Sequence, residues 1–201
     1  TIGFPVTYID VGGIVRFART YEGLGLQAAH RVRWGDDRSL RLVAGVDLDR
    51  MREDRQGFFN DLGNARELKR DELNHVKSGD VYVQASMDLA ANWTATAGVR
   101  SSHVRFETQD RFVREDDPAT TDVDERNPLD SGAFGYHATN PVLGLSWRAT
   151  PALNLYANVG RGFETPTFTE LAYRPGGATG LNSDLLASRS RHAEIGVKWK
   201  P

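Results

Sequence analysis

The chain has 201 residues, of which 39% are hydrophobic and 26% charged, and its formal net charge is −2. No stretch approaches the roughly 18 consecutive apolar residues that a membrane helix needs, which excludes a helical membrane protein. The absence of cysteine excludes disulfides and thiolate chemistry, and the near-neutral charge gives no reason to expect nucleic acid as a partner.

Alternation of apolar and polar residues runs through most of the chain and predicts an all-β protein. In chain order, the pattern predicts about eight strands, at 11–17, 24–34, 40–48, 81–89, 93–99, 143–149, 153–159 and 193–199. The first strand shows the weakest pattern, and a glycine-containing link at 21–23 separates it from the second. Each strand has one apolar and one polar face, so strands of this kind can also cross a membrane as part of a β-barrel.

The connections between the predicted strands alternate in length. Three are short, at 35–38, 90–92 and 149–152, whereas the connections at 52–76, 107–132 and 164–188 each exceed twenty residues. Successive hairpins therefore have one tight end and one long end. An antiparallel up-and-down transmembrane β-barrel has this asymmetry, with short periplasmic turns and long outer loops.

All four tryptophans fall on the apolar faces of their strands. Each lies beside a short connection or at the matching end of the last strand, at Trp34, Trp93, Trp147 and Trp199. Indole rings favour the level where hydrocarbon meets water, because the ring is apolar and its N–H needs a partner. We expect these residues to form a belt at a membrane interface. The alternative is that they cover one end of a buried core.

The polar faces carry many charges, including Arg31, Arg33, Arg41, Asp47, Asp49, Asp88 and Arg100. A small closed barrel would crowd these groups together, because side chains must fill its interior. A wide lumen, such as that of the 22-stranded transporters, leaves them facing water or a plug domain. The charges therefore favour a segment of a wide barrel.

Near the C-terminus the sequence becomes similar to that of a known family. A strand ends in a G-x-G-[FY]-x-x-P-x-[FL]-x-E-L pattern made by Gly160, Gly162, Phe163, Pro166, Phe168, Glu170 and Leu171. An N-x-D-L run and an S-R-x-x-E-x-G-x-K-W strand follow, with Asn182, Asp184, Leu185, Ser190, Arg191, Glu194, Gly196, Lys198 and Trp199. This region resembles the barrel of TonB-dependent outer-membrane receptors of the ferric-siderophore type.

The resemblance implies a fold, a ligand and a location. Residues 1–201 would be part of a receptor barrel, with the plug and the remaining strands absent from this sequence. The partners would be a ferric siderophore or similar small chelate, outer-membrane lipid, and the TonB energy-coupling complex, which acts through the plug. Iron would enter only as part of the chelate, with no cofactor of the protein's own. The location would be the outer membrane of a Gram-negative bacterium.

The long connections are where such a ligand would bind. They combine cationic and aromatic side chains, which suit an anionic, aromatic or oxygen-rich chelate. The candidate ligand residues are Arg55, Phe58, Phe59, Arg111, Arg114, Phe168, Tyr173 and Arg174. For any single residue, the competing interpretation is a solvated loop surface.

The sequence contains no convincing motif of an enzyme or of a metal site. Residues 23–28 match G-x-G-x-x-A formally, but they open a predicted strand, and no helix follows. The five histidines lack ligand spacing, and an acidic run at Asp122, Asp124 and Glu125 lacks the glycine and final glutamate of a calcium loop. No serine lies in a nucleophile motif. We therefore expect no enzymatic activity.

Two other classes remain open at this stage. The first is a complete eight-stranded outer-membrane barrel of the adhesin or enzyme type. The second is a soluble β-barrel or sandwich that binds a ligand. The direction of the apolar faces separates the soluble class from the others, because a soluble fold packs those faces together in a dry centre.

Overall fold

The computed structural model describes residues 5–10, 13–34, 38–112, 131–171 and 181–200. They form one eight-stranded antiparallel sheet in which every strand pairs with its neighbours in the sequence. The strands are β1 Pro5–Asp10, β2 Gly13–Arg33, β3 Ser39–Asp61, β4 Asn64–Ala90, β5 Trp93–Asp110, β6 Gly132–Thr150, β7 Leu153–Glu164 and β8 Ser188–Trp199, and the one described helix is α1 Phe168–Leu171.

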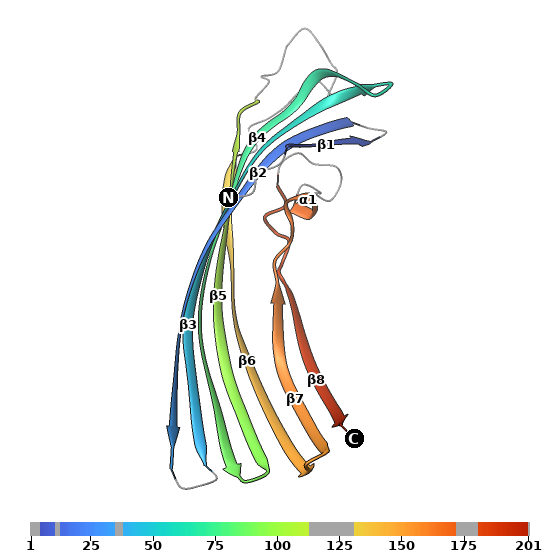
Figure 1. The fold of residues 1–201 in the computed structure, drawn as a ribbon. Coiled ribbons are helices and arrows are strands. Elements are labelled where there is room, and N and C mark those ends of the chain that lie inside the picture. Colours follow the sequence, from blue (N-terminus) through green and yellow to red (C-terminus); the bar gives the residue numbers. More distant parts are fainter. Residues whose placement is uncertain (1–4, 11–12, 35–37, 113–130, 172–180, 201) are drawn as a thin grey trace.

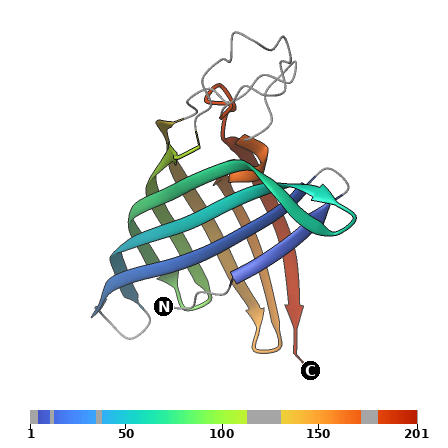
Figure 2. The same ribbon diagram turned by 90° about the horizontal axis from the view of Figure 1, so that it is seen from above.

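The sheet is strongly curved, and α1 lies in its concave side (Figure 1). Seen from above, the long strands β2 to β4 pass in front of β6 to β8, so the sheet bends around a hollow (Figure 2). In the described part of the chain β1 and β8 are the two edges, and they do not pair with each other. The predicted all-β, up-and-down architecture is confirmed, and the sheet is open.

The alternation predicted from the sequence sets the two faces of the sheet. Leu24, Leu26 and Ile195 are 69%, 70% and 87% exposed on the convex face, and Val81 and Leu143 are each 57% exposed there. These apolar faces do not meet in a dry centre. The soluble sandwich is therefore the wrong interpretation, because such a fold would bury these side chains.

The predicted start of the sheet is wrong in two respects. The link expected at 21–23 does not exist, because β2 runs without a break from Gly13 to Arg33, and the separate strand before it is β1. Gly23 and Gly25 do not form a turn; they leave space for side chains of the neighbouring strand. A Cβ at Gly23 would lie 2.6 Å from an Asp49 carboxylate oxygen, and one at Gly25 would lie 3.0 Å from that of Asp47.

The long connection expected at 52–76 is also wrong. Strands β3 and β4 continue through this segment and meet at a two-residue turn, Leu62-Gly63, whose φ angles are 51° and 91°. Both values are positive, as in the primed turns that join hairpins, and the Asn60 side chain accepts a 2.8 Å hydrogen bond from the Gly63 N–H. The segment looked irregular because, beyond the apolar band, both faces of the hairpin are polar.

The other two long connections differ in how far the structure describes them. β5 extends to Asp110, so the expected 107–132 connection begins later, and residues 113–130 of it lie outside the described residues. The 164–188 connection has the expected bounds, between the end of β7 at Glu164 and the start of β8 at Ser188. Of the three predicted short connections, those at 90–92 and 149–152 are confirmed and are two-residue turns at 91–92 and 151–152, whereas residues 35–37 of the connection at 35–38 lie outside the described residues.

Candidate functional site on the concave face

The connection between β7 and β8 folds onto the concave face of the sheet. Phe168 and Leu171 of α1 are 8% and 0% exposed and pack with Phe106 of β5. The Phe106 ring lies edge-on to Phe168, with centroids 5.3 Å apart, and stacks on Phe134 at 5.6 Å. This small aromatic core fixes the upper part of the hollow, where Tyr136 also meets Phe106 edge-on at 5.8 Å.

Hydrogen bonds hold the same connection in place. The Glu170 carboxylate accepts bonds from the Thr167 N–H at 2.8 Å and the Thr167 hydroxyl at 2.9 Å, and these bonds lower the pKa of Glu170. The Asn182 N–H donates to the Leu171 carbonyl at 2.6 Å, and the Tyr136 hydroxyl donates to the Leu185 carbonyl at 2.7 Å. We call residues 164–171 and 181–188 the strap, because they cross the concave face and are tied to it at both ends.

A buried polar network lies beside the aromatic core. Glu53 is 1% exposed, pairs with Arg19, and accepts a hydrogen bond from the Asn74 amide at 3.3 Å. Asn74, also 1% exposed, accepts a 2.9 Å bond from the Thr108 hydroxyl. Glu72 is 6% exposed and pairs with Arg70 at 2.8 Å. Burial raises the pKa of Glu72, because a low-dielectric surrounding disfavours its charged form.

Arg55 belongs to this network and has one buried hydrogen-bond donor without a partner among the described residues. Its guanidinium lies 4.0 Å from the Glu53 carboxylate, and its Nε is buried without a hydrogen-bond partner among the described residues. Buried donors are normally satisfied, so an unpaired one calls for an explanation such as a ligand or a bound water. Arg55 is one of the predicted ligand residues, and it occupies the concave face as that role requires.

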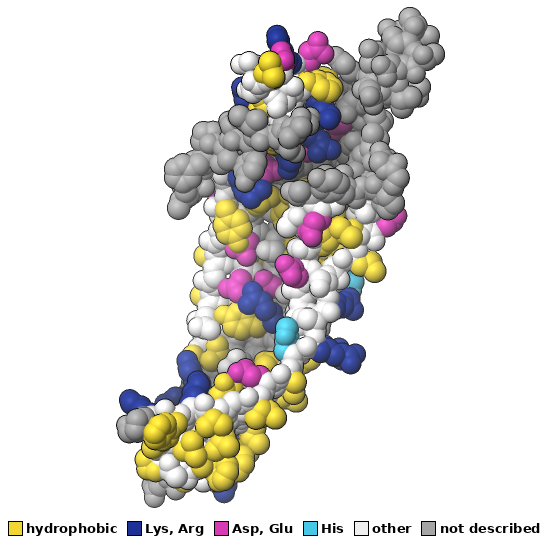
Figure 3. Space-filling view, turned by 90° about the vertical axis from the view of Figure 1, so that its right-hand side faces the viewer, with side chains coloured by type: hydrophobic (Ala, Val, Ile, Leu, Met, Phe, Trp, Pro, Cys, Tyr) yellow, Lys and Arg dark blue, Asp and Glu magenta, His cyan; other side chains and the backbone are white. Residues whose placement is uncertain are grey.

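A second charged group lies midway along the hollow. Arg100 of β5 reaches across β4 and pairs with Asp80 at 2.8 Å and Asp47 at 3.0 Å. Its guanidinium lies 5.5 Å above the Tyr82 ring. Seen from the open side, acidic and basic side chains gather in the middle of the hollow, and hydrophobic side chains lie towards the lower end (Figure 3). The wide hollow predicted from these charges agrees with this arrangement.

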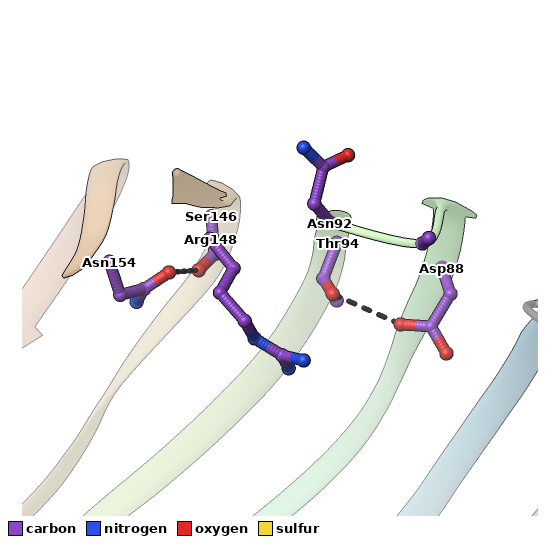
Figure 4. Close-up of a pocket in the computed structure, with 7 residues that line it drawn as sticks. Asp88, Asn92, Thr94, Ser146, Arg148 and Asn154 are labelled. Atoms are coloured by element: carbon purple, nitrogen blue, oxygen red, sulfur yellow. Dashed lines mark hydrogen bonds between the residues drawn. The ribbon is translucent and has the colours of Figure 1, made fainter. Parts of the chain in front are cut away.

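A polar pocket of about 210 Å³ lies near the turns. The Asp88 carboxylate accepts bonds from the Thr94 hydroxyl at 3.0 Å and the Ser39 hydroxyl at 2.6 Å. The Ser146 hydroxyl donates to the Asn154 side chain at 2.9 Å. Arg148 extends between these two groups (Figure 4). Polar side chains that hydrogen-bond to one another therefore line the concave face near the short turns.

Several residues of the family motif have structural roles. The Tyr156 ring lies across Gly196, its register partner on β8, and the Tyr156 hydroxyl donates to Glu194 at 2.7 Å. Gly162 leaves room for Ser190 and His192. The remaining motif residues lie in the same region, with Gly160 and Phe163 on β7, Pro166 and Asp184 in the strap, and Arg191 exposed on β8.

The remaining predicted ligand residues are in varied surroundings. Phe58 packs under Arg16 at 5.0 Å, and Phe59, 43% exposed, lies under Lys69 at 5.4 Å. Arg111 pairs with Asp54 at 2.6 Å and with Asp71, and Arg111 in turn lowers the pKa of Asp54. Arg111 is thus held by two carboxylates at the outer end of the hairpin. Phe168 is buried in the aromatic core, and Arg114, Tyr173 and Arg174 lie outside the described residues.

The sequence alone did not identify the buried network of Glu53, Glu72 and Asn74. These residues fell in the segment predicted to be a loop, where charge runs indicated a solvated surface. A usable signal was present, because residues 51, 53 and 55 continue the inward alternation of β3 past the end of its apolar run. The network depends on the register between the three consecutive strands β3, β4 and β5, since Glu53 pairs with Asn74 and Asn74 with Thr108.

The four tryptophans lie at the end of the sheet with the short turns. Trp93 and Trp147 are register partners, and their rings stack with centroids 5.4 Å apart. Trp34 directly follows β2, and Trp199 pairs with Leu153 beside the turn at 151–152. They do not cover the buried core, whose Phe106 lies thirteen residues from Trp93 on β5. Their place at a membrane interface remains a prediction.

Within the described residues, no helix combines the length and apolar character needed to cross a bilayer. In the same part of the chain, no three histidine, aspartate or glutamate side chains come together as metal ligands do.

The open antiparallel sheet, apolar on its convex face and charged on its concave face, defines the class as a segment of a wide β-barrel. The chain matches the family model described as "TonB dependent receptor-like, beta-barrel" over residues 3–201. The match covers nearly the whole chain, and the chain belongs to the TonB-dependent receptor-like β-barrel family. The predicted family is confirmed.

Solved structures share the fold at low sequence identity. The ferric yersiniabactin uptake receptor FyuA from Yersinia pestis superposes with a TM-score of 0.72 and 18% identity, covering 99% of this chain and 29% of that one. The ferric citrate transporter FecA, in its unliganded form, gives 0.70 and 17%, with 97% and 27% covered. The copper transporter OprC gives 0.65 and 18%, with 94% and 29% covered. The chain thus spans under a third of the length of these proteins.

Proposed function

We propose that residues 1–201 form part of the barrel of a receptor in the outer membrane of a Gram-negative bacterium, which takes up a ferric siderophore or a similar metal chelate. The ligand binds from the outer side, above the concave face. Uptake follows displacement of a plug by the TonB energy-coupling complex. The chain performs no chemistry on its ligand.

One observation carries the proposal: this sheet turns its apolar face outward and lines a hollow with charged side chains. Arg100 with Asp47 and Asp80, and Arg55 with Glu53, lie along that hollow. The exposed convex face suits lipid, because an apolar face of this size is costly in water. FyuA is named as an uptake receptor, and FecA and OprC are named as transporters, which agrees with a chelate or metal as cargo.

The unpartnered Nε of Arg55 supports this part of the hollow as the ligand-binding region. An anionic chelate would provide the acceptor that its buried Nε lacks. Charge-assisted hydrogen bonds contribute about 1.5–3 kcal/mol, so loss of this donor weakens binding by about tenfold or more. We expect Arg55→Gln to have that effect on the chelate that the receptor binds.

The test is a binding titration of the full-length receptor that carries this segment. Ferric citrate, a ferric catecholate and a copper salt are titrated separately, and tryptophan fluorescence reports binding. Arg66→Gln is the matched control, because Arg66 pairs with the exposed Asp61 near the tip of the β3–β4 hairpin. Failure of all three probes to bind at millimolar concentration would contradict the proposed uptake function. Equal affinity of the Arg55→Gln and Arg66→Gln variants would remove Arg55 from the site.

A further inference from the structure

On the convex face, the apolar runs of three strands, β3, β7 and β8, end directly at a cation. On β3 the outward residues run from Leu40 to Leu48, and Arg50 is the next one. β7 repeats this with Val159 and then Arg161, and β8 with Ala193 and then Arg191. On β4 and β5 one or two outward residues without an apolar side chain follow the apolar run, and the next outward residues are Lys77 and Arg105. We call these five residues the outer basic collar: Arg50, Lys77, Arg105, Arg161 and Arg191.

The members of the collar face one another across the strands. Lys77 is the register partner of both Arg50 and Arg105, and Arg161 is the partner of Arg191. Like charges directly opposite each other destabilise a sheet, because their side chains lie within about 4.5–5.5 Å at Cβ. Three cations in a row and a second opposed pair therefore carry a cost that a bound anion would relieve.

The chain itself does not supply that anion. All five collar residues are exposed, and among the described residues none has a carboxylate oxygen within the 4.0 Å of an ion pair. Glu22 lies opposite Arg50, and Glu107 lies beside Arg105 on β5, yet neither forms an ion pair with the collar. The concave face differs, since Asp47 and Asp80 also oppose each other but share the Arg100 guanidinium.

The distance between the collar and the tryptophans matches a bilayer. Arg191 is eight residues from Trp199 along β8, and Arg105 is twelve from Trp93 along β5. At about 3.4 Å per residue and a tilt near 45°, these separations correspond to roughly 19–29 Å of height, close to the apolar band of about 25 Å in outer-membrane barrels. The collar therefore lies at the level of the lipid head groups opposite the tryptophan end.

An apolar groove lies below the collar on the same sheet. It has a volume of about 510 Å³, and alanines at 85, 95, 97 and 157 leave space between Met87, Leu143 and Leu145. Val159 forms its margin, and the next outward residue on β7 is Arg161. An acyl chain in the groove would bring its head group towards Arg161 and Arg191.

We propose that the outer basic collar binds the phosphate groups of an anionic membrane lipid, with an acyl chain of that lipid in the groove. This inference rests on the membrane location given under the proposed function. Phosphate suits the collar because a guanidinium donates two parallel hydrogen bonds to its oxygens. The Arg161 and Arg191 pair, which borders the groove, is the main contact.

The experiment uses the full-length receptor in an uncharged detergent, with native mass spectrometry to titrate phosphatidylglycerol and phosphatidylcholine. Each cation near an anionic lipid surface contributes about 1 kcal/mol, so removal of two weakens phosphatidylglycerol binding by about 30-fold. We expect that loss in the double variant Arg161→Gln with Arg191→Gln, with no change for phosphatidylcholine. The double lysine variant at the same positions keeps most of the preference.

Arg31→Gln with Arg41→Gln is the matched control, because these arginines are also register partners but lie on the concave face. It is expected to bind both lipids as the wild type does. Equal phosphatidylglycerol affinity of the Arg161/Arg191 double glutamine variant and the wild type would overturn the inference, as would displacement of the lipid by equimolar inorganic phosphate. Chelate binding is measured in parallel: lipid preference without chelate binding would contradict only the proposed uptake.

Discussion

Two tyrosines on the concave face lie over glycines of the adjacent strand. The Tyr82 ring covers Gly45, its register partner, and Tyr156 covers Gly196 in the same way. Each ring also has a cation above it, Arg100 at 5.5 Å and Lys198 at 5.3 Å. Glycine is required at these positions because a Cβ would occupy the space of the ring, so the E-x-G part of the family motif reflects packing.

Gly45→Ala is therefore expected to destabilise the sheet. Its Cβ would lie 2.5 Å from the Tyr82 ring and 2.8 Å from the Leu26 carbonyl oxygen, and the backbone oxygen cannot move aside. Overpacking of this kind costs about 1–3 kcal/mol. The matched control is Gly79→Ala, whose Cβ meets only Leu48 at 3.5 Å. Denaturant midpoints of the two variants in detergent check the prediction, and equal midpoints would contradict it.

The buried carboxyl of Glu72 predicts a dependence of stability on pH. Burial raises the pKa of Glu72 above 4.5, because the folded state favours the protonated carboxyl. The stability that this preference contributes is fully present below pH 4.5 and is lost as the pH rises through the folded-state pKa. We expect Glu72→Gln to remove this loss. The variant should gain stability relative to the wild type between pH 4 and pH 8, as measured by denaturant midpoints. Parallel pH profiles of the two proteins would show that the Arg70 ion pair compensates fully for burial.

At the scale of elements, the strap is a fixed part of the concave face. A four-residue helix has little stability of its own, because nucleating a helix is costly and few hydrogen bonds follow. α1 is stable here because Phe168 and Leu171 are buried against Phe106 and because Thr167 and Glu170 cap its start. The strap therefore depends on the sheet, and its position is set by one aromatic cluster.

Leu171→Ala is expected to release the strap. Leu171 is fully buried, and removing its side chain costs about 2–5 kcal/mol, which exceeds what a short connection can lose while remaining in place. Hydrogen exchange at the Asn182 and Leu171 amides, both hydrogen-bonded within the strap, measures the release. Leu186→Ala is the control, since Leu186 lies in the same connection and is 83% exposed. Equally fast exchange in both variants would argue against the anchoring role.

The β3–β4 hairpin shows how far an element extends beyond its apolar band. β4 has 27 residues, whereas a membrane-crossing strand needs only about 9–11. The part beyond Lys77 is stabilised by polar pairs, such as Arg70 with Glu72 and Arg111 with Asp71. The hairpin therefore extends above the collar as a polar wall, and Met51 and Val76 of the hairpin pack against the aromatic core.

At the scale of the whole molecule, the two edge strands dominate the expected behaviour. β1 and β8 each leave one row of backbone donors and acceptors without a strand partner in the described sheet. Such edges pair with other strands, because unpaired backbone groups are costly in an apolar medium. We expect the isolated 201-residue chain in detergent to assemble with copies of itself. Light scattering measures the assembly, and a stable monomer with fast-exchanging β8 amides would contradict the prediction.

Local pattern was sufficient to predict the existence and order of the strands from β5 to β8, although β5 and β6 are longer than predicted, since β5 ends at Asp110 and β6 begins at Gly132. Within the apolar band each strand alternates between a lipid-suited and a polar face, and the short turns follow from the same pattern, as at Ala91-Asn92. Prediction failed where both faces were polar, so that β3 and β4 were ended too early. It also failed at Gly23, where a glycine that accommodates Asp49 was taken for a link.

The candidate site could be predicted only in part. Arg55 was chosen for its charge and lies on the concave face, but its unpaired Nε follows from the positions of Glu53 and the strands around it. Phe168 was chosen as a ligand contact and is instead a core residue, because α1 folds back onto Phe106. Neither outcome can be read from local sequence. The burial of Phe168 depends on Phe106, more than fifty positions away, and the surroundings of Arg55 depend on the neighbouring strands.

The sequence by itself determined the strand class, the two unlike faces and the receptor family, because these depend on residue type at a period of two and on short motifs. Only the tertiary structure decided which charges are buried together, where the strap lies and which cations oppose one another. The physical reason is that pairing, burial and repulsion depend on register between strands, and register brings together residues that no local pattern connects.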